Sequence, residues 1–123
     1  MIQPLALVIY QRLLPGSQLV NRLQDLNYRV LVQSDVAGLA ATVQRESPLL
    51  LLIDLTVPGD VPGALATLRS TPATAHVPVL GFAPENAPEL LPAAQAAGAN
   101  LAVTDSALLN HLAQLLDQAL HLD

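Results

Sequence analysis

The stretch from Leu49 to Gly63 (LLLLIDLTVPGDVPG) decides the fold class of this chain. Its first part, from Leu49 to Asp54, is apolar up to a final aspartate, which is typical of a strand that helices cover on both faces. Its second part, from Thr56 to Gly63, is rich in Pro and Gly and predicts a loop that leads into a helix. A buried strand that ends in one carboxylate and passes through a loop into a helix indicates a βα unit.

The same alternation continues on both sides of this stretch, because short apolar runs are separated by segments with helical spacing. The predicted strands are, in chain order, Leu5 to Tyr10, Tyr28 to Gln33, Leu49 to Asp54, His76 to Phe82 and Leu101 to Thr104. Five βα units in a row predict a three-layer, doubly wound α/β domain, with a five-stranded parallel sheet and helices on both faces. We expect a single domain over residues 1–123.

Capping residues predict where two of the helices begin. Ser34 or Asp35 is expected to cap the second helix directly after the second strand. Asp105 or Ser106 is expected to cap the last helix in the same way, and we expect this helix to continue unbroken to about His121.

Composition excludes several classes of protein. Hydrophobic residues make up 52% of the chain and charged residues 12%, which is the opposite of the balance in disordered proteins. The formal net charge is −5 and all five bases are Arg, so the chain is a poor candidate for binding nucleic acid or anionic membrane. With no Cys, it offers neither disulfides nor thiolate zinc sites. The first residues do not resemble a signal peptide and no apolar run is long enough to span a bilayer, so we expect a cytoplasmic protein.

Residues at the carboxyl ends of the predicted strands are the candidates for a functional site, because ligands of open parallel sheets bind there. The residues that end the strands are, in chain order, Tyr10 and Gln11, Gln33 and Ser34, Asp54, Ala83 and Asp105. Asp54 stands out, since it ends a fully apolar strand, where an ionised carboxylate needs partners or exposure. No His, Ser and Asp fall together at these ends, so we do not expect a conventional enzyme.

The βα pattern, the strand that ends in Asp54 and the run Asp54–Pro58 (DLTVP) resemble the receiver domain of bacterial two-component response regulators. Val77–Leu80 (VPVL) is similar to the fourth strand of that family, and Ala93–Val103 (AAQAAGANLAV) is similar to its fourth helix and fifth strand. The resemblance covers nearly the whole chain and implies a flavodoxin-like sheet with strand order 2-1-3-4-5. It also implies that Asp54 lies at the position of the phosphoacceptor aspartate.

Most of the other residues that such a receiver uses are absent. In the family, two acids after the first strand, the acceptor and a backbone carbonyl two residues later hold Mg²⁺, while a hydroxyl and a Lys bind the phosphoryl oxygens. The resemblance places Tyr10 and Gln11 at the acid positions, Thr56 at the carbonyl, Ala83 at the hydroxyl and Asp105 at the Lys. The chain contains no Lys at all. The resemblance therefore implies a pseudo-receiver without a cofactor, which signals by protein–protein interaction and independently of aspartyl phosphorylation.

Other interpretations stay open at this point. The chain could be a phosphorelay receiver that is still phosphorylated at Asp54 by an atypical, weakly Mg²⁺-dependent route. Asp54, Asp60 and Asp105 could form a remodelled cation site, and the Tyr10 hydroxyl could either donate toward Asp54 or face water. A doubly wound domain that binds a nucleotide or flavin is a further class, but the chain lacks a G-x-G-x-x-G or P-loop motif to support it.

The last predicted helix carries more Leu than one core-facing stripe requires. The leucines that widen its apolar face are Leu109, Leu116, Leu120 and Leu122. Either the fourth helix covers them or they form a surface for a protein partner. The resemblance favours a partner or a homodimer, because receivers commonly associate through the fourth helix, fifth strand and fifth helix.

Overall fold

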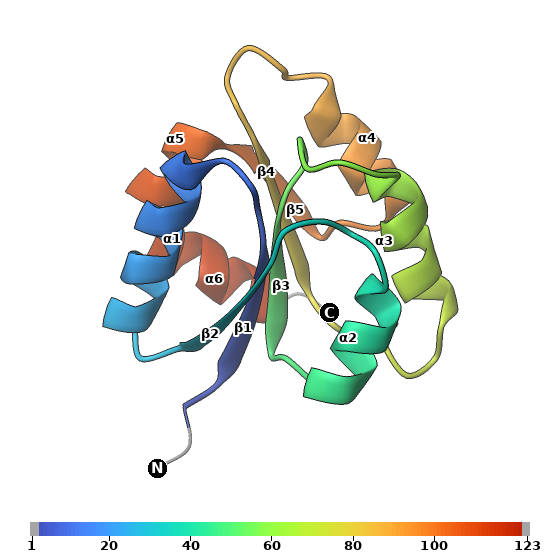
Figure 1. The fold of residues 1–123 in the computed structure, drawn as a ribbon. Helices are drawn as coiled ribbons and strands as arrows, with labels where there is room; N and C mark the ends of the chain where they lie inside the picture. The colour runs from blue at the N-terminus through green and yellow to red at the C-terminus, as the bar shows by residue number, and fades with distance from the viewer. Residues whose placement is uncertain (1–2, 122–123) are drawn as a thin grey trace.

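The computed structural model describes residues 3–121, which form three layers with a five-stranded parallel sheet between two layers of helices (Figure 1). The strands lie in the order β2-β1-β3-β4-β5 and comprise β1 (Leu5–Ile9), β2 (Arg29–Gln33), β3 (Leu50–Asp54), β4 (Val79–Ala83) and β5 (Leu101–Thr104). The helices are α1 (Leu13–Asp25), α2 (Leu39–Glu46), α3 (Val61–Ser70), α4 (Leu90–Ala97), α5 (Asp105–Asn110) and α6 (Leu112–Leu120). None of these helices is long and apolar enough to cross a membrane. The predicted fold class and strand order are confirmed.

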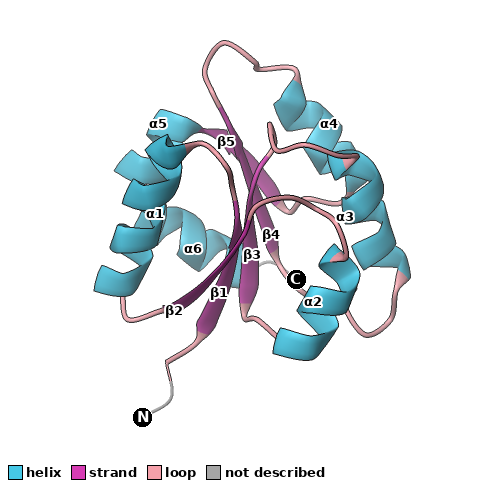
Figure 2. Cartoon of the chain, in the orientation of Figure 1, coloured by secondary structure: helices cyan, strands magenta, loops and turns pink. Residues whose placement is uncertain are grey.

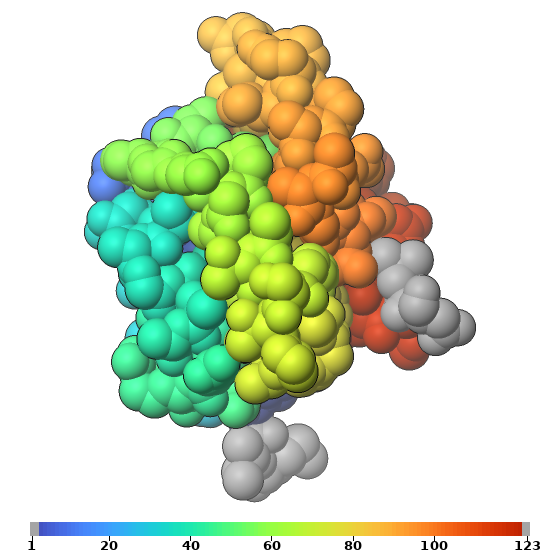
Figure 3. Space-filling model, turned by 90° about the vertical axis from the view of Figure 1, so that its right-hand side faces the viewer, coloured from blue at the N-terminus to red at the C-terminus, as the bar shows by residue number. Residues whose placement is uncertain are grey.

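Successive residues of the central strands point to opposite faces of the sheet and so contribute to two separate cores. Val8 and Leu52 belong to the core under α1, α5 and α6, whereas Leu7 and Leu51 belong to the core under α2, α3 and α4. Figure 2 shows the helices divided between the two faces, and Figure 3 shows α2, α3 and α4 side by side on one of them. Because both faces are covered, the central strands consist almost entirely of apolar residues.

The second helix begins later than predicted. The Asp35 side chain accepts a hydrogen bond from the backbone N–H of Ala37 at 3.0 Å and closes a turn there. Gly38 follows in the left-handed region with φ 63°, a conformation that glycine adopts without strain. Asp35 therefore caps a turn and not a helix, and α2 starts at Leu39.

The last helix is not continuous, and the prediction of one unbroken helix is wrong. His111 has φ −128° and ψ 27°, which ends α5 at Asn110 and lets α6 begin at Leu112. The cap of α5 is also not one of the two predicted residues. It is Thr104, whose hydroxyl accepts a hydrogen bond from the backbone N–H of Ala107 at 3.3 Å.

One of the leucines predicted for a partner surface faces the sheet instead. Leu116, which was predicted for a partner surface, is only 4% exposed and belongs to the core under α1, α5 and α6, so that prediction is wrong. Leu109 and Leu120 are half-buried against the same core. Leu122 lies outside the described residues.

Candidate functional site

Two carboxylates and one guanidinium meet at the carboxyl edge of the sheet. Asp54 is the last residue of β3, Asp105 is the first residue of α5, and Arg12 lies between β1 and α1. The Arg12 Nε donates a hydrogen bond to Asp54 Oδ2 at 2.7 Å. Its Nη1 and Nη2 donate to the Oδ2 and Oδ1 of Asp105 at 2.8 and 3.1 Å. We call this arrangement the Arg12 bridge, and it joins three segments that are far apart in the sequence.

The carboxylate of Asp54 is fully buried and both of its oxygens are bonded inside the chain. Its Oδ2 accepts from Arg12, while its Oδ1 accepts from the backbone N–H of Thr56 at 2.9 Å and from the Thr56 hydroxyl at 2.8 Å. Within residues 3–121, no buried side-chain nitrogen or oxygen lacks a hydrogen-bond partner. The chain itself therefore supplies the partners that a buried carboxylate requires.

The electrostatics of the bridge favour the charged form of Arg12. The hydrogen bond from Arg12 to Asp105 is the largest cause that raises the Arg12 pKa above its ordinary value, Asp54 adds to it, and burial opposes it. The planar guanidinium also matches Asp105 with two parallel hydrogen bonds, which a Lys ammonium does not provide. Asp54 consequently has a permanent counterion, supplied by a side chain that is 30% exposed.

The other predicted site residues lie near the bridge without joining it. Tyr10 is half-buried, and its ring lies so close to Gly16 of α1 that no side chain fits at that position. In the part of the chain that the structure describes, no hydrogen bond joins Tyr10 to Asp54, so the first of the two alternatives for the Tyr10 hydroxyl does not hold. Gln11 is exposed, and Ala83 is fully buried at the end of β4.

The residues at this edge do not fit a divalent cation. The Asp60 Oδ1 accepts a hydrogen bond from the backbone N–H of Gly63 at 3.0 Å and so caps α3. Among the described residues, no three His, Asp or Glu side chains are grouped so that they could hold a metal ion. The guanidinium of Arg12 bonds directly to the carboxylates of Asp54 and Asp105, where a cation would have to bind. Asp54, Asp60 and Asp105 therefore do not form the cation site that the sequence allowed.

Sequence reasoning missed Arg12, although the chain contained a signal for it. A carboxylate that ends a fully apolar strand requires a positive partner or exposure. Arg12 is the only base within three residues of the carboxyl end of any predicted strand. Matching the lone carboxylate of Asp54 with this lone base would have identified the pair.

A second polar contact ties the loop after β4 to the start of α5. The Glu85 Oε1 accepts a hydrogen bond from the backbone N–H of Ser106 at 3.0 Å and from the Ser106 hydroxyl at 2.6 Å. These bonds lower the pKa of the exposed Glu85 carboxyl, with the Ser106 hydroxyl as the largest cause. Asp105 and Ser106 are adjacent, so the first turn of α5 is tied to two loops.

The Glu85 contact predicts a specific loss of stability in acid. A carboxyl whose pKa is lower in the folded protein stabilises the fold above its unfolded value and loses this contribution as the pH falls through the folded value. The ordinary pKa of the Glu85 carboxyl is 4.5. We therefore expect the wild type to lose the stability that Glu85 contributes as the pH falls below this value, and we expect Glu85→Gln not to show this part of the loss. Urea midpoints at about pH 7 and about pH 3.5 measure the difference. Glu89→Gln, at an exposed position of the same loop, is the control, and an equal response of the two variants would contradict the prediction.

Solved structures share the fold of this chain over nearly its whole length. A protein from Chloroflexus aurantiacus described as a response regulator has a TM-score of 0.87 and 19% identity, with 97% of this chain and 98% of that chain covered. The receiver domain of the sensor histidine kinase PA1611 from Pseudomonas aeruginosa, with a magnesium ion coordinated in its active-site cleft, has a TM-score of 0.85 and 18% identity, with 97% and 98% covered.

The chemotaxis response regulator CheY4 of Vibrio cholerae has a TM-score of 0.75 and 19% identity, with 93% of this chain and 99% of that chain covered. No protein-family model matches the sequence, and no curated protein matches it. The likeness is therefore one of structure, and this chain has the fold of the response-regulator receiver domains.

Proposed function

We propose that this chain is a receiver-like domain of the cytoplasm that acts in signal transduction by protein–protein contact, without phosphorylation of Asp54. The observation that carries the proposal is the Arg12 bridge, in which a guanidinium bonds both carboxylates at the carboxyl edge of the sheet. The domain is then a binding module and not an enzyme.

The condition of Asp54 supports this proposal. An aspartate accepts a phosphoryl group when a carboxylate oxygen is free to attack and a cation neutralises the charge that develops. Here both oxygens of Asp54 already accept hydrogen bonds and the side chain is fully buried. The Pseudomonas receiver domain has a magnesium ion coordinated in its active-site cleft, whereas here Arg12 provides the positive charge between the carboxylates.

The residues around Asp54 support the same conclusion. Asp105 stands where the family resemblance places a Lys, so a negative charge replaces the positive charge that would attract a phosphoryl group. Ala83 stands where it places a hydroxyl, and its methyl group offers no hydrogen bond to a phosphoryl oxygen. Arg12 already donates hydrogen bonds to both Asp54 and Asp105, so these two carboxylates have a positive partner without a ligand.

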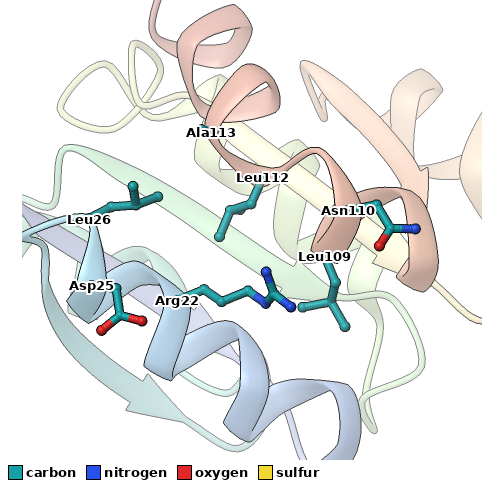
Figure 4. Close-up of a pocket in the computed structure, with 7 residues that line it drawn as sticks. All are labelled: Arg22, Asp25, Leu26, Leu109, Asn110, Leu112 and Ala113. Carbon is teal, nitrogen blue, oxygen red and sulfur yellow. The ribbon is translucent and has the colours of Figure 1, made fainter.

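We propose that the surface formed by α4, β5 and α5 contacts the protein partner. All four residues of β5 are only partly buried, so this edge of the sheet is accessible. On the adjacent α4, Ala93 and Ala96 are exposed, and such small side chains permit close approach of another backbone. Leu109 of α5, which the sequence predicted for this surface, lies away from it, because it lines a hollow with Arg22 and Leu26 beside α1 (Figure 4).

An amide NMR titration tests the proposal. We expect Mg²⁺, and then Mg²⁺ with beryllofluoride as a phosphoryl mimic, to leave the signals of Asp54, Thr56 and α5 unchanged in the wild type. The reason is that Arg12 already neutralises the carboxylates that a cation would bind. Saturable shifts of these signals would contradict the proposal and would identify Asp54 as a working phosphoacceptor.

A variant with the family's residues restored is the positive control for this titration. The five changes are Tyr10→Asp, Gln11→Asp, Arg12→Ala, Ala83→Thr and Asp105→Lys. We expect this variant to bind Mg²⁺ saturably, since the acids return and the competing guanidinium is removed. The same variant with Arg12 retained is the matched comparison, and we expect its affinity for Mg²⁺ to be at least about tenfold lower.

A further inference from the structure

The helix that follows the last strand, α5, has only six residues and is too short to be stable by itself. Isolated helices of fewer than about 12 residues are marginal in water, so the position of α5 depends on its contacts with the rest of the domain. Leu108 is the one residue of α5 that is fully buried. By contrast, α6 buries the apolar side chains of Leu112, Leu116 and Ala119. Apolar packing therefore anchors α5 less firmly than it anchors α6.

The backbone hydrogen bonds are interrupted between α5 and α6. His111 leaves the helical conformation, and Figure 4 shows Asn110 and Leu112 on either side of this break. The N–H of His111 donates to the Ala107 carbonyl at 3.0 Å, and the N–H of Leu115 donates to the His111 carbonyl at 2.9 Å. Within residues 3–121, no backbone hydrogen bond joins an N–H of α6 to a carbonyl of α5. The position of His111 is therefore suited to a hinge, where a change in φ and ψ turns one helix relative to the other.

Polar contacts hold α5 at the end that lies away from α6. Asp105, the first residue of the helix, accepts two hydrogen bonds from Arg12, at 2.8 and 3.1 Å. Arg12 is itself held in place, because its Nε donates to Asp54, which is fully buried at the end of β3. The backbone N–H and the hydroxyl of Ser106 both donate to Glu85. These charge-assisted bonds provide at the first turn the anchoring that α5 lacks in apolar burial.

We propose that α5 opens as a unit about His111 while the sheet and α6 stay folded, and that the Arg12 bridge holds it closed. The helix then has two positions. In the closed position, which is the one described above, Asp105 is bonded to Arg12 and Leu108 is buried. In the open position these bonds are broken and Leu108 is uncovered. An element with few buried apolar contacts opens at a lower free energy than the core of the same domain.

The opening of α5 regulates the surface of α4, β5 and α5 that we propose for the protein partner. Because α5 is part of that surface, the surface is complete only while the Arg12 bridge is intact. A partner that binds the complete surface favours the closed position and shifts the population toward it. Arg12 is then a positioning residue, which acts through α5. This consequence for the partner rests on the proposed function, whereas the opening of α5 does not.

Thiol labelling at two buried positions tests the opening. The chain contains no Cys, so a single introduced Cys is the only thiol that iodoacetamide can label. Leu108→Cys reports on α5 and Ala119→Cys reports on α6, because these positions are 0% and 1% exposed in the closed structure. Each labelling rate is divided by the rate of the same thiol in the urea-unfolded chain. We expect the resulting rate for Leu108→Cys to be at least about tenfold higher than that for Ala119→Cys.

Two Arg variants connect this opening with the Arg12 bridge. Arg12→Ala removes both hydrogen bonds to Asp105, and we expect it to increase the labelling rate of Leu108→Cys at least about tenfold. Arg69→Ala is the matched control, because the hydrogen bonds of Arg69 lie at the opposite edge of the sheet and none of them reaches α5. We expect Arg69→Ala to accelerate the labelling of Ala119→Cys, which requires global unfolding, and to leave Leu108→Cys unchanged within about twofold.

Amide hydrogen exchange repeats the comparison with Leu108 intact. The N–H of His111, which is bonded to the Ala107 carbonyl, reports on α5. The N–H of Leu51 donates to the Pro78 carbonyl at 2.9 Å and reports on the sheet. We expect Arg12→Ala to accelerate the exchange of His111 at least about tenfold. We expect Arg69→Ala to accelerate the exchange of Leu51 and to leave that of His111 unchanged within about twofold.

Three results would overturn the proposal. The first is equal labelling of Leu108→Cys and Ala119→Cys, and the second is equal acceleration of both by Arg69→Ala, since α5 would then open only when the whole domain unfolds. The third is an Arg12→Ala variant in which neither the labelling of Leu108→Cys nor the exchange of His111 is faster. The magnesium titration tests the proposed function separately, so the failure of one proposal is distinguishable from the failure of the other.

Discussion

Replacing Arg12 with Ala is expected to lower the free energy of unfolding by about 2–3 kcal/mol at neutral pH. The change leaves the fully buried Asp54 without its counterion and removes both hydrogen bonds to Asp105. This loss of stability is smaller than or equal to the smallest loss typical of breaking a fully buried ion pair, because Arg12 is itself 30% exposed and water enters in its place. Urea unfolding of the two proteins measures the difference.

The double variant Arg12→Ala with Asp54→Asn shows how much of the lost stability comes from the unpaired charge of Asp54 and how much from the lost packing of Arg12. The introduced amide keeps an acceptor oxygen for Thr56 and carries no buried charge, so we expect the double variant to recover more than half of the loss. Arg22→Ala removes an exposed guanidinium of α1 and is expected to change stability by less than about 0.5 kcal/mol. If the double variant were no more stable than Arg12→Ala, the bridge would act through packing and not through charge.

Replacing Arg69 with Ala is expected to cost about 2–4 kcal/mol, because this side chain holds together three segments at the opposite edge of the sheet. Its Nε donates to the carbonyl of Gly98 at 2.9 Å, and its Nη1 donates to the carbonyls of Ala75 and Val77, both at 2.8 Å. Its Nη2 donates to the Asn100 Oδ1 at 2.6 Å. Burial lowers the pKa of Arg69 from its ordinary value, but the group stays charged at neutral pH. Thermal or urea unfolding measures the loss.

One further variant tests whether the hydrogen-bond geometry or the charge of Arg69 stabilises the fold, and a second variant is its control. Arg69→Lys keeps the charge but cannot reach all four acceptors, so we expect it to recover only a minor part of the loss. Arg45→Ala is the control for an exposed Arg, since Arg45 is 66% exposed and bonds only to Glu46 in the described structure, and we expect an effect below about 0.5 kcal/mol. Full recovery with Arg69→Lys would contradict the role given to the hydrogen bonds.

The strands of the sheet could be predicted from the sequence because the residues that determine each strand are adjacent in the chain. Each central strand is an apolar run bounded by residues that favour turns, and β5 was predicted with its observed bounds. The order of the strands did not follow from the runs themselves but from the resemblance to receivers. Helix bounds were less accurate where side chains compete with the helix, as Asp35 does when it closes a turn, or where the backbone breaks, as at His111.

The Arg12 bridge and the contacts of Arg69 could not be predicted from local patterns. A guanidinium reaches several ångströms from its backbone, so its partners depend on how loops from different βα units are placed in space. Asp54, Thr56, Ala83 and Asp105 were located correctly at the carboxyl edge because each lies at or near a strand end. Leu116 was misplaced for a different reason: it follows Leu108 and Leu112 at steps of four residues, and that whole stripe packs against the sheet.

The Arg12 bridge determines what the amount of bound partner can depend on in a cell. A phosphorylated receiver encodes information in the fraction of molecules that carry a modification, and that fraction changes when phosphate is added or hydrolysed. Under the proposed function, every copy of this chain has the same bridge, because its cation is part of the polypeptide. The share of partner that is bound then follows the concentration of the chain through mass action alone. Synthesis and degradation, and not a kinase, would set the time over which its output changes.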